Sequence, residues 1–202
     1  MRLLGDVYDC SARKQSVIQQ LMTLGKMTAG QAVMVDLNEV LTGLGTKFRK
    51  ALGSRRSLKL QLEPDIPPIK ADPGELRENL FRLVLDARDA MPDGGVVEVS
   101  SATITPADGK RSVRVLIRDT GKGIRASARD RVFDPYYQSR PGNRNPGFSL
   151  TLVYQFVALS GGSIEVQTSP AGAAYVLSFP AAENSPSSAN IEEKPLSASA
   201  LG

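Results

Sequence analysis

The sequence of 202 residues contains no histidine and one cysteine. Because Ser-His-Asp and Cys-His triads, imidazole-ligated metal sites and phosphohistidine all need an imidazole ring, the chain can supply none of them. The single cysteine, Cys10, excludes an internal disulfide, and no cysteine cluster could hold zinc. No apolar run approaches the roughly 18 residues of a membrane-spanning helix, and no signal peptide opens the chain. We therefore expect a cytoplasmic chain without a membrane segment.

The composition is that of a globular protein with a small basic excess. Apolar residues make up 41% of the chain, and 25 lysines and arginines against 21 acidic residues give a net charge of +4. The length corresponds to about 1.3 domains, which favours one domain with appendages. A nucleic-acid-binding interpretation would depend only on a basic stretch, which is more simply a solvated helix end and turn, so we expect no nucleic-acid partner. The stretch comprises Lys47, Arg49, Lys50, Arg55, Arg56 and Lys59.

We predict three segments, 1–31, 32–182 and 183–202. An apolar seam with alternating spacings of four and three residues predicts a helix over residues 1–28. That helix would either form a homodimer or pack on its own domain. From Glu183 onward the chain has five serines, two prolines and no aromatic residue, which predicts a disordered linker or tail. The seam consists of Leu3, Val7, Cys10, Val17, Leu21 and Leu24.

The middle segment alternates helical and strand patterns. Asp36 is a predicted cap of a helix that Gly53 ends, and Asp72 followed by Pro73 predicts the start of a second helix that ends near Met91. Alternating or apolar stretches predict strands at 58–62, 95–104, 112–118, 163–168 and 174–179, with 95–104 and 112–118 as an antiparallel hairpin. A third helix is expected over 148–160.

The pattern that most indicates a binding site is Asp119 at the end of a predicted strand, followed by Gly121 and Gly123. A carboxylate there can accept a hydrogen bond from an exocyclic amine such as that of adenine, and glycines let backbone approach a flat base or a phosphate. A plain strand-to-helix turn would use the same residues, so the pattern alone leaves both interpretations open. The next 26 residues, 121–146, are longer than most connections, which is typical of a binding loop or lid.

Several motifs, in this order, resemble the ATP-binding domain of sensor histidine kinases. They are the helix 77–95 with its Ala-Arg-Asp-Ala-Met-Pro-Asp-Gly-Gly end, the Asp119 motif, the island 132–137 and Gly147 before a helix. The resemblance covers about residues 36–180. It implies an α+β fold, the two-layer α/β sandwich of Bergerat-type ATPases, with helices on one face of a mixed sheet and ATP held between the long helix and a mobile lid.

The resemblance also implies roles for single residues. Asp119 would bind the adenine amine, and Gly121 and Gly123 would shape the pocket. Arg140 stands where the family often has a lid lysine and could reach a γ-phosphate, although ordinary solvated loop charge is the alternative. The residues that would fasten the lid are Phe133, Tyr136 and Tyr137.

The sequence departs from the family on the phosphate side. Arg82 and Asp86 replace two asparagines, of which the second holds Mg²⁺ in the family. Asp86 could ligate Mg²⁺ through oxygen, but it adds a negative charge beside the triphosphate. Arg82 could contact a phosphate, or pair with Asp86 at helical i, i+4 spacing, in which case the metal is lost. In the lid only Gly147 remains of three glycines, and Pro146 lacks an N–H.

The phosphoacceptor histidine of the family is absent. Residues 1–28 look like the second helix of the hairpin whose first helix carries it, and Tyr8 is a poor substitute because it lies on that second helix. The resemblance implies a response regulator or receiver domain as partner. We therefore expect a histidine-kinase-like ATP-binding domain with weakened ATP and Mg²⁺ binding and impaired or absent activity. The alternative is a non-catalytic adaptor that dimerises and docks response regulators.

Overall fold

The computed structural model describes residues 31–105, 109–125, 128, 131–134 and 149–182. The predicted N-terminal helix, the predicted tail and most of the predicted lid lie outside these residues. Within the described ranges, no helix is both long and apolar enough to cross a membrane.

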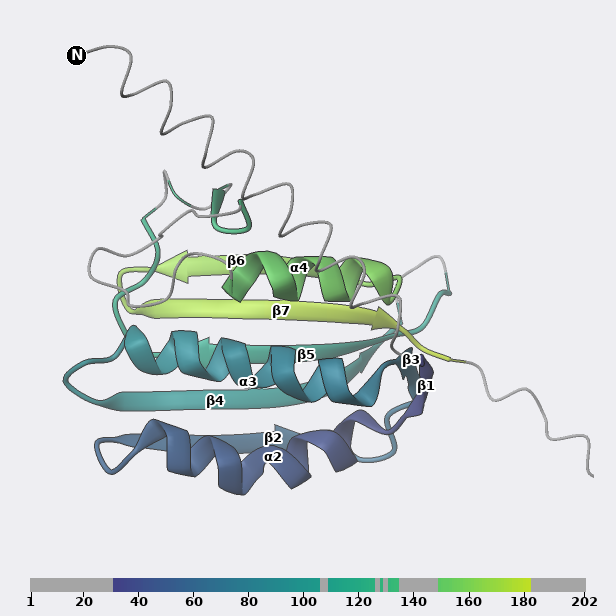
Figure 1. The fold of residues 1–202 in the computed structure, drawn as a ribbon, viewed down its shortest axis with the longest axis horizontal. Helices are drawn as coiled ribbons and strands as arrows, with labels where there is room; N and C mark the ends of the chain where they lie inside the picture. The colour runs from purple at the N-terminus through teal and green to yellow at the C-terminus, as the bar shows by residue number, and fades with distance from the viewer. Residues whose placement is uncertain (1–30, 106–108, 126–127, 129–130, 135–148, 183–202) are drawn as a thin grey trace, which may run out of the picture.

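Five strands form one mixed sheet, and three helices cover one of its faces (Figure 1). The spatial order is β2 (Arg56–Leu62), β4 (Gly95–Ile104), β5 (Ser112–Asp119), β7 (Gly172–Pro180) and β6 (Ser163–Ser169). The β2–β4 pair is parallel and the other pairs are antiparallel. The covering helices are α2 (Leu37–Leu52), α3 (Pro73–Asp89) and α4 (Ser149–Leu159). The predicted two-layer α/β arrangement and the antiparallel hairpin are confirmed.

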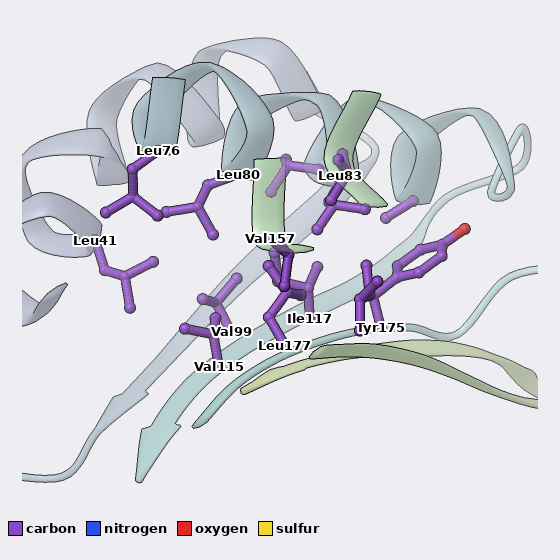
Figure 2. Packing of buried hydrophobic residues seen from close by; sticks show 14 of the residues in the cluster. Leu41, Leu76, Leu80, Leu83, Val99, Val115, Ile117, Val157, Tyr175 and Leu177 are labelled. Atoms are coloured by element: carbon purple, nitrogen blue, oxygen red, sulfur yellow. The ribbon is translucent and has the colours of Figure 1, made fainter. Parts of the chain in front are cut away.

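The core lies between the helices and the inward face of the sheet (Figure 2). Alternate strand residues such as Val99, Val115 and Ile117 are fully buried against Leu80 and Leu83 of α3. Burying a side chain of this size contributes about 2 kcal/mol, so the repeated period-two pattern of β4 and β5 fixes which face meets the helices.

Capping residues determine where α2 and α3 begin. The Asp36 carboxylate accepts hydrogen bonds from the backbone N–H groups of Asn38 and Glu39 at the start of α2. The Asp72 carboxylate accepts one from the N–H of Glu75 at 2.8 Å, with Pro73 as the first residue of α3. Each cap satisfies N–H groups that have no partner inside the helix, so both predicted starts are confirmed.

One small sheet was not predicted. Strands β1 (Val33–Val35) and β3 (Ile69–Ala71) form a separate antiparallel two-stranded sheet, in which Met34 is opposite Lys70. Three residues are too few for a period to be recognised, and β3 follows directly on Pro67 and Pro68, which signal a break.

Candidate nucleotide site

Asp119 is the last residue of β5, and its side chain is held in a fixed orientation. The residue is 2% exposed and lies on the helix-facing side of the sheet, as Ile117 does. Its Oδ1 accepts a hydrogen bond from the N–H of Gly121 at 2.8 Å, and the N–H of Ala173 on β7 lies at 3.4 Å. The position predicted for this carboxylate, at the end of a buried strand, is therefore observed.

The two glycines after Asp119 allow three chain segments to meet. A Cβ atom at Gly121 would lie 2.5 Å from the carbonyl oxygen of Ala90, just after α3, and one at Gly123 would overlap the carbonyl oxygen of Ser169. Both contacts are with backbone, which cannot rotate away as a side chain can. The glycines therefore pack the Asp119 loop against the end of α3 on one side and the β6–β7 turn on the other.

Two threonine hydroxyls that the sequence analysis did not single out hold this loop. Thr168 Oγ1 accepts from the N–H of Ile124 at 2.7 Å and donates to the carbonyl of Ile124 at 2.9 Å. Thr120 Oγ1 accepts from the N–H of Val96 at 3.0 Å. A hydroxyl among inward-facing strand positions needs a hydrogen-bond partner, and this is the sequence signal that could have identified Thr168.

Asp86 lies on the buried face of α3 and is 3% exposed. Its Oδ2 accepts a hydrogen bond from the hydroxyl of Tyr175, which is fully buried on β7. Figure 2 shows Tyr175 with its hydroxyl pointing away from the aliphatic cluster. Tyr175 was not predicted as a site residue, although a tyrosine at an inward strand position requires a partner for its hydroxyl.

Arg82 does not adopt the predicted pairing with Asp86. Its Nη1 donates to Asn79 Oδ1 at 3.2 Å, towards the start of α3, and Asn79 in turn donates to the carbonyl of Glu75. Asp86 instead turns towards β7 and Tyr175. The other alternative, Arg82 on a phosphate, stays a prediction.

Phe133, in the described part of the predicted lid, packs against α4. The ring of Phe133 lies 5.5 Å from that of Tyr154, centroid to centroid, and its carbonyl accepts a hydrogen bond from Thr151 at 2.9 Å. Phe133 therefore contacts α4, and its role in fastening a lid stays a prediction. The other predicted lid and phosphate residues, Tyr136, Tyr137, Arg140, Pro146 and Gly147, lie outside the described residues.

Asp86 is the predicted Mg²⁺ ligand, and it lies among the residues that the structure describes. No group of three or more histidine, cysteine, aspartate or glutamate side chains that could hold a metal occurs among them. Mg²⁺ takes oxygen ligands in near-octahedral geometry and keeps several of its waters. Asp86, the predicted ligand, is buried, and the Tyr175 hydroxyl is bound to one of its oxygens, so it does not present the accessible carboxylate that such an ion needs.

Two hollows of the described surface lie differently with respect to the predicted adenine-binding position at Asp119. One of about 340 Å³ touches Asp119 but is also lined by Arg118 and Gln167, which alternate with the inward-facing residues, so it extends to the outer face of the sheet. A larger one, about 880 Å³, lies among residues such as Pro67 and Arg111, away from Asp119.

Comparison with known proteins identifies the family of this fold. The family described as histidine kinase-, DNA gyrase B- and HSP90-like ATPase matches residues 71–183. The sensor kinase CckA of Brucella abortus (strain 2308) is 30% identical over 162 residues, which are 75% of this chain and 17% of CckA. The chain thus spans about a sixth of that relative's length.

Solved structures agree with this result. The mycobacterial sensor histidine kinase MprB is 26% identical, with a TM-score of 0.61 over 74% of this chain and 97% of that one. Full-length ShkA in complex with AMPPNP has a TM-score of 0.66 over 83% of this chain and 36% of ShkA, and at 23% identity it supports the fold alone. The chain therefore belongs to the histidine kinase-, DNA gyrase B- and HSP90-like ATPase family, and its domain is of the sensor histidine kinase type.

Proposed function

We propose that the chain is the ATP-binding part of a two-component histidine kinase, and that it has kept adenine recognition while its grip on the triphosphate is weakened. The observation that carries this proposal is the Asp119 carboxylate. It is buried at the end of β5 and oriented by the N–H of Gly121. A fixed, buried acceptor of this kind suits the exocyclic amine of a purine.

In this proposal, the domain contributes positioning rather than a nucleophile. Phosphoryl transfer depends mainly on alignment of the phosphate with its acceptor and on stabilisation of charge. Since the sequence contains no histidine, a histidine acceptor would have to lie outside this sequence, in another segment or another chain. Arg140 would be the candidate for γ-phosphate contact.

The weakened grip is supported by the charges on α3. Asp86 places a carboxylate where the family has a neutral amide, and Arg82 donates to Asn79. A buried negative charge near the phosphates lowers affinity unless a cation offsets it, and Asp86 is poorly placed to bind one.

The Asp86–Tyr175 hydrogen bond also favours a second candidate, a non-catalytic module. In that function the domain would dock a response regulator or receiver domain in the cytoplasm, with residues 1–28 forming a homodimer. Binding of ATP would then be weak or absent.

Calorimetric titration with adenosine and ATP tests adenine recognition. We expect binding by the unaltered chain and at least about tenfold weaker binding by Asp119→Asn, which presents an amide in place of one carboxylate acceptor. The control is Asp65→Asn, an exposed residue at φ 55°, a conformation that asparagine tolerates. Equal affinity of Asp119→Asn and the unaltered chain would contradict the proposed role of Asp119.

A further inference from the structure

Asp119 and Tyr175, the partner of Asp86, lie on the same helix-facing side of the sheet. Tyr175, the partner of Asp86, is opposite Ile117 in the β5–β7 register, and Asp119 follows Ile117 by two residues. Two strand residues span about 7 Å, so Tyr175 lies on the neighbouring strand one inward-facing position along from Asp119.

In this pair the Asp86 carboxylate accepts a hydrogen bond from a hydroxyl, whereas an ion-binding carboxylate would present its oxygens to a cation. Tyr175 has no exposed surface and donates its hydroxyl proton to Asp86, which draws the carboxylate towards β7. The tyrosine satisfies one oxygen of a buried acid that would otherwise be costly to keep there. The acid therefore has a structural partner in place of a cation.

The Asp86–Tyr175 pair affects how tightly a negatively charged ligand binds nearby. A purine with few phosphates brings little negative charge towards Asp86, whereas each further phosphate adds charge that no cation held at this carboxylate would offset. Affinity should therefore fall as phosphates are added, opposite to the order expected when a metal bridges protein and triphosphate.

We propose that the Asp86–Tyr175 pair makes this a site for adenine ligands of low charge, adenosine or its monophosphate, taken without a divalent cation. Tyr175 is then a specificity-determining residue. This inference rests on the proposed adenine recognition by Asp119.

Titration of the full chain with adenosine, AMP, ADP and ATP, each with and without Mg²⁺, tests the ligand class. We expect adenosine to bind at least about tenfold more tightly than ATP, and Mg²⁺ to change each affinity by less than about twofold. Tighter binding of ATP with Mg²⁺ would overturn this inference while leaving adenine recognition intact. No binding of any adenine ligand at millimolar concentration would overturn the proposed function, and this inference with it.

Two variants assign the effect to the pair. Asp86→Asn removes the charge but keeps an oxygen that can accept from Tyr175, so the affinity for ATP relative to adenosine should rise about tenfold. The matched control is Glu78→Gln, which removes one negative charge from the exposed face of the same helix, where Glu78 pairs with Lys47 at 3.3 Å. The control should change the ratio by less than about twofold. An unchanged ratio in Asp86→Asn would overturn the inference.

Tyr175→Phe tests the role of the hydroxyl. Without that donor the carboxylate can turn outward, and binding of ADP should become dependent on a divalent cation, with a bound Mn²⁺ signal in electron paramagnetic resonance. Thermal unfolding establishes that this variant is folded, and Asp86→Asn supplies the test if it is not. A folded Tyr175→Phe chain without cation dependence would overturn the assignment to Tyr175.

Discussion

At the scale of single residues, Gly123 shows how little space the Asp119 loop has. A Cβ atom there would overlap the carbonyl oxygen of Ser169, which is backbone. Gly123→Ala should therefore lower the free energy of unfolding by about 2 kcal/mol through overpacking, measured by urea denaturation.

The control for that change is another glycine of the same chain. Gly43 lies on the exposed side of α2, and nothing lies within 4 Å of a Cβ placed on it. Gly43→Ala should raise the free energy of unfolding by about 1 kcal/mol, because alanine is the better helix former. Equal effects at the two glycines would show that the close contact at Gly123 is not the cause.

Thr168 is a second residue whose contribution to the free energy of unfolding can be measured. Its hydroxyl satisfies both the N–H and the carbonyl of Ile124. Thr168→Val keeps the shape but leaves these groups without that partner, so the free energy of unfolding should fall by about 2 kcal/mol. Thr168→Ser, which keeps the hydroxyl, should lose less than half of that in the same denaturation experiment. Similar losses would indicate that the methyl packing of Thr168 matters more than its hydroxyl.

Part of the candidate site could be predicted from the sequence at this scale. Asp119, Gly121 and Gly123 could be found because they are adjacent in sequence and follow a recognisable strand. The partnership of Asp86 with Tyr175 spans 89 positions and depends on the register of β7 under α3, which local patterns do not contain. The helical spacing instead offered Arg82 as one of the possible partners of Asp86.

At the scale of elements, Arg56 joins the ends of two helices. Its Nε donates to the carbonyl of Met91, just after α3, at 2.8 Å, and its Nη1 donates to the carbonyl of Leu52 at the end of α2 at 3.2 Å. The Leu52 carbonyl has no partner within α2, and a cation suits the negative end of a helix. The Met91 carbonyl also accepts a hydrogen bond from the N–H of Gly94 at 3.2 Å, so Arg56 is its second donor. The sequence analysis had grouped Arg56 with solvated basic residues.

Arg56→Met should therefore lower the free energy of unfolding by about 2 kcal/mol, measured by thermal or urea denaturation. Arg55→Met, at the exposed neighbouring position, should stay within about 0.5 kcal/mol of the unaltered chain. If both changes cost the same, the two carbonyl contacts of Arg56 do not stabilise the junction.

Helices with recognisable capping residues could be predicted from the sequence, whereas very short strands could not. α2 and α3 could be placed from Asp36, Asp72 and Gly53 because capping chemistry is local. β1 and β3 could not be placed, since a three-residue strand gains its stability from its pairing partner and not from its own pattern.

At the scale of the whole molecule, the predicted segments 1–31 and 32–182 imply a separable dimerisation helix. A chain that begins at residue 32 should sediment as a monomer and unfold within about 3 °C of the full chain, because the core cluster runs from Val35 to Phe179. The full chain should sediment as a dimer. A dimer that persists without residues 1–31 would place the interface on the domain itself.

The mixed sheet and its single helical layer could be predicted from the order of motifs, because their resemblance to a known family carries topology that residue patterns do not. The parallel pairing of β2 with β4 was not itself predicted, since local patterns predicted the strands but not their order. The proposed ligand class would depend on the assembled layers, in which α3 and β7 bring Asp86 and Tyr175 together and β5 places Asp119 on the same side of the sheet.

The most direct test is the ratio of two dissociation constants of the unaltered chain, one for adenosine and one for ATP with saturating Mg²⁺, measured in the same buffer by calorimetry. If the adenine-reading carboxylate is retained and the acid on α3 is bound to Tyr175, adenosine binds more tightly, by at least about tenfold. A tighter complex with ATP and Mg²⁺ would contradict the proposal that the triphosphate grip is weakened.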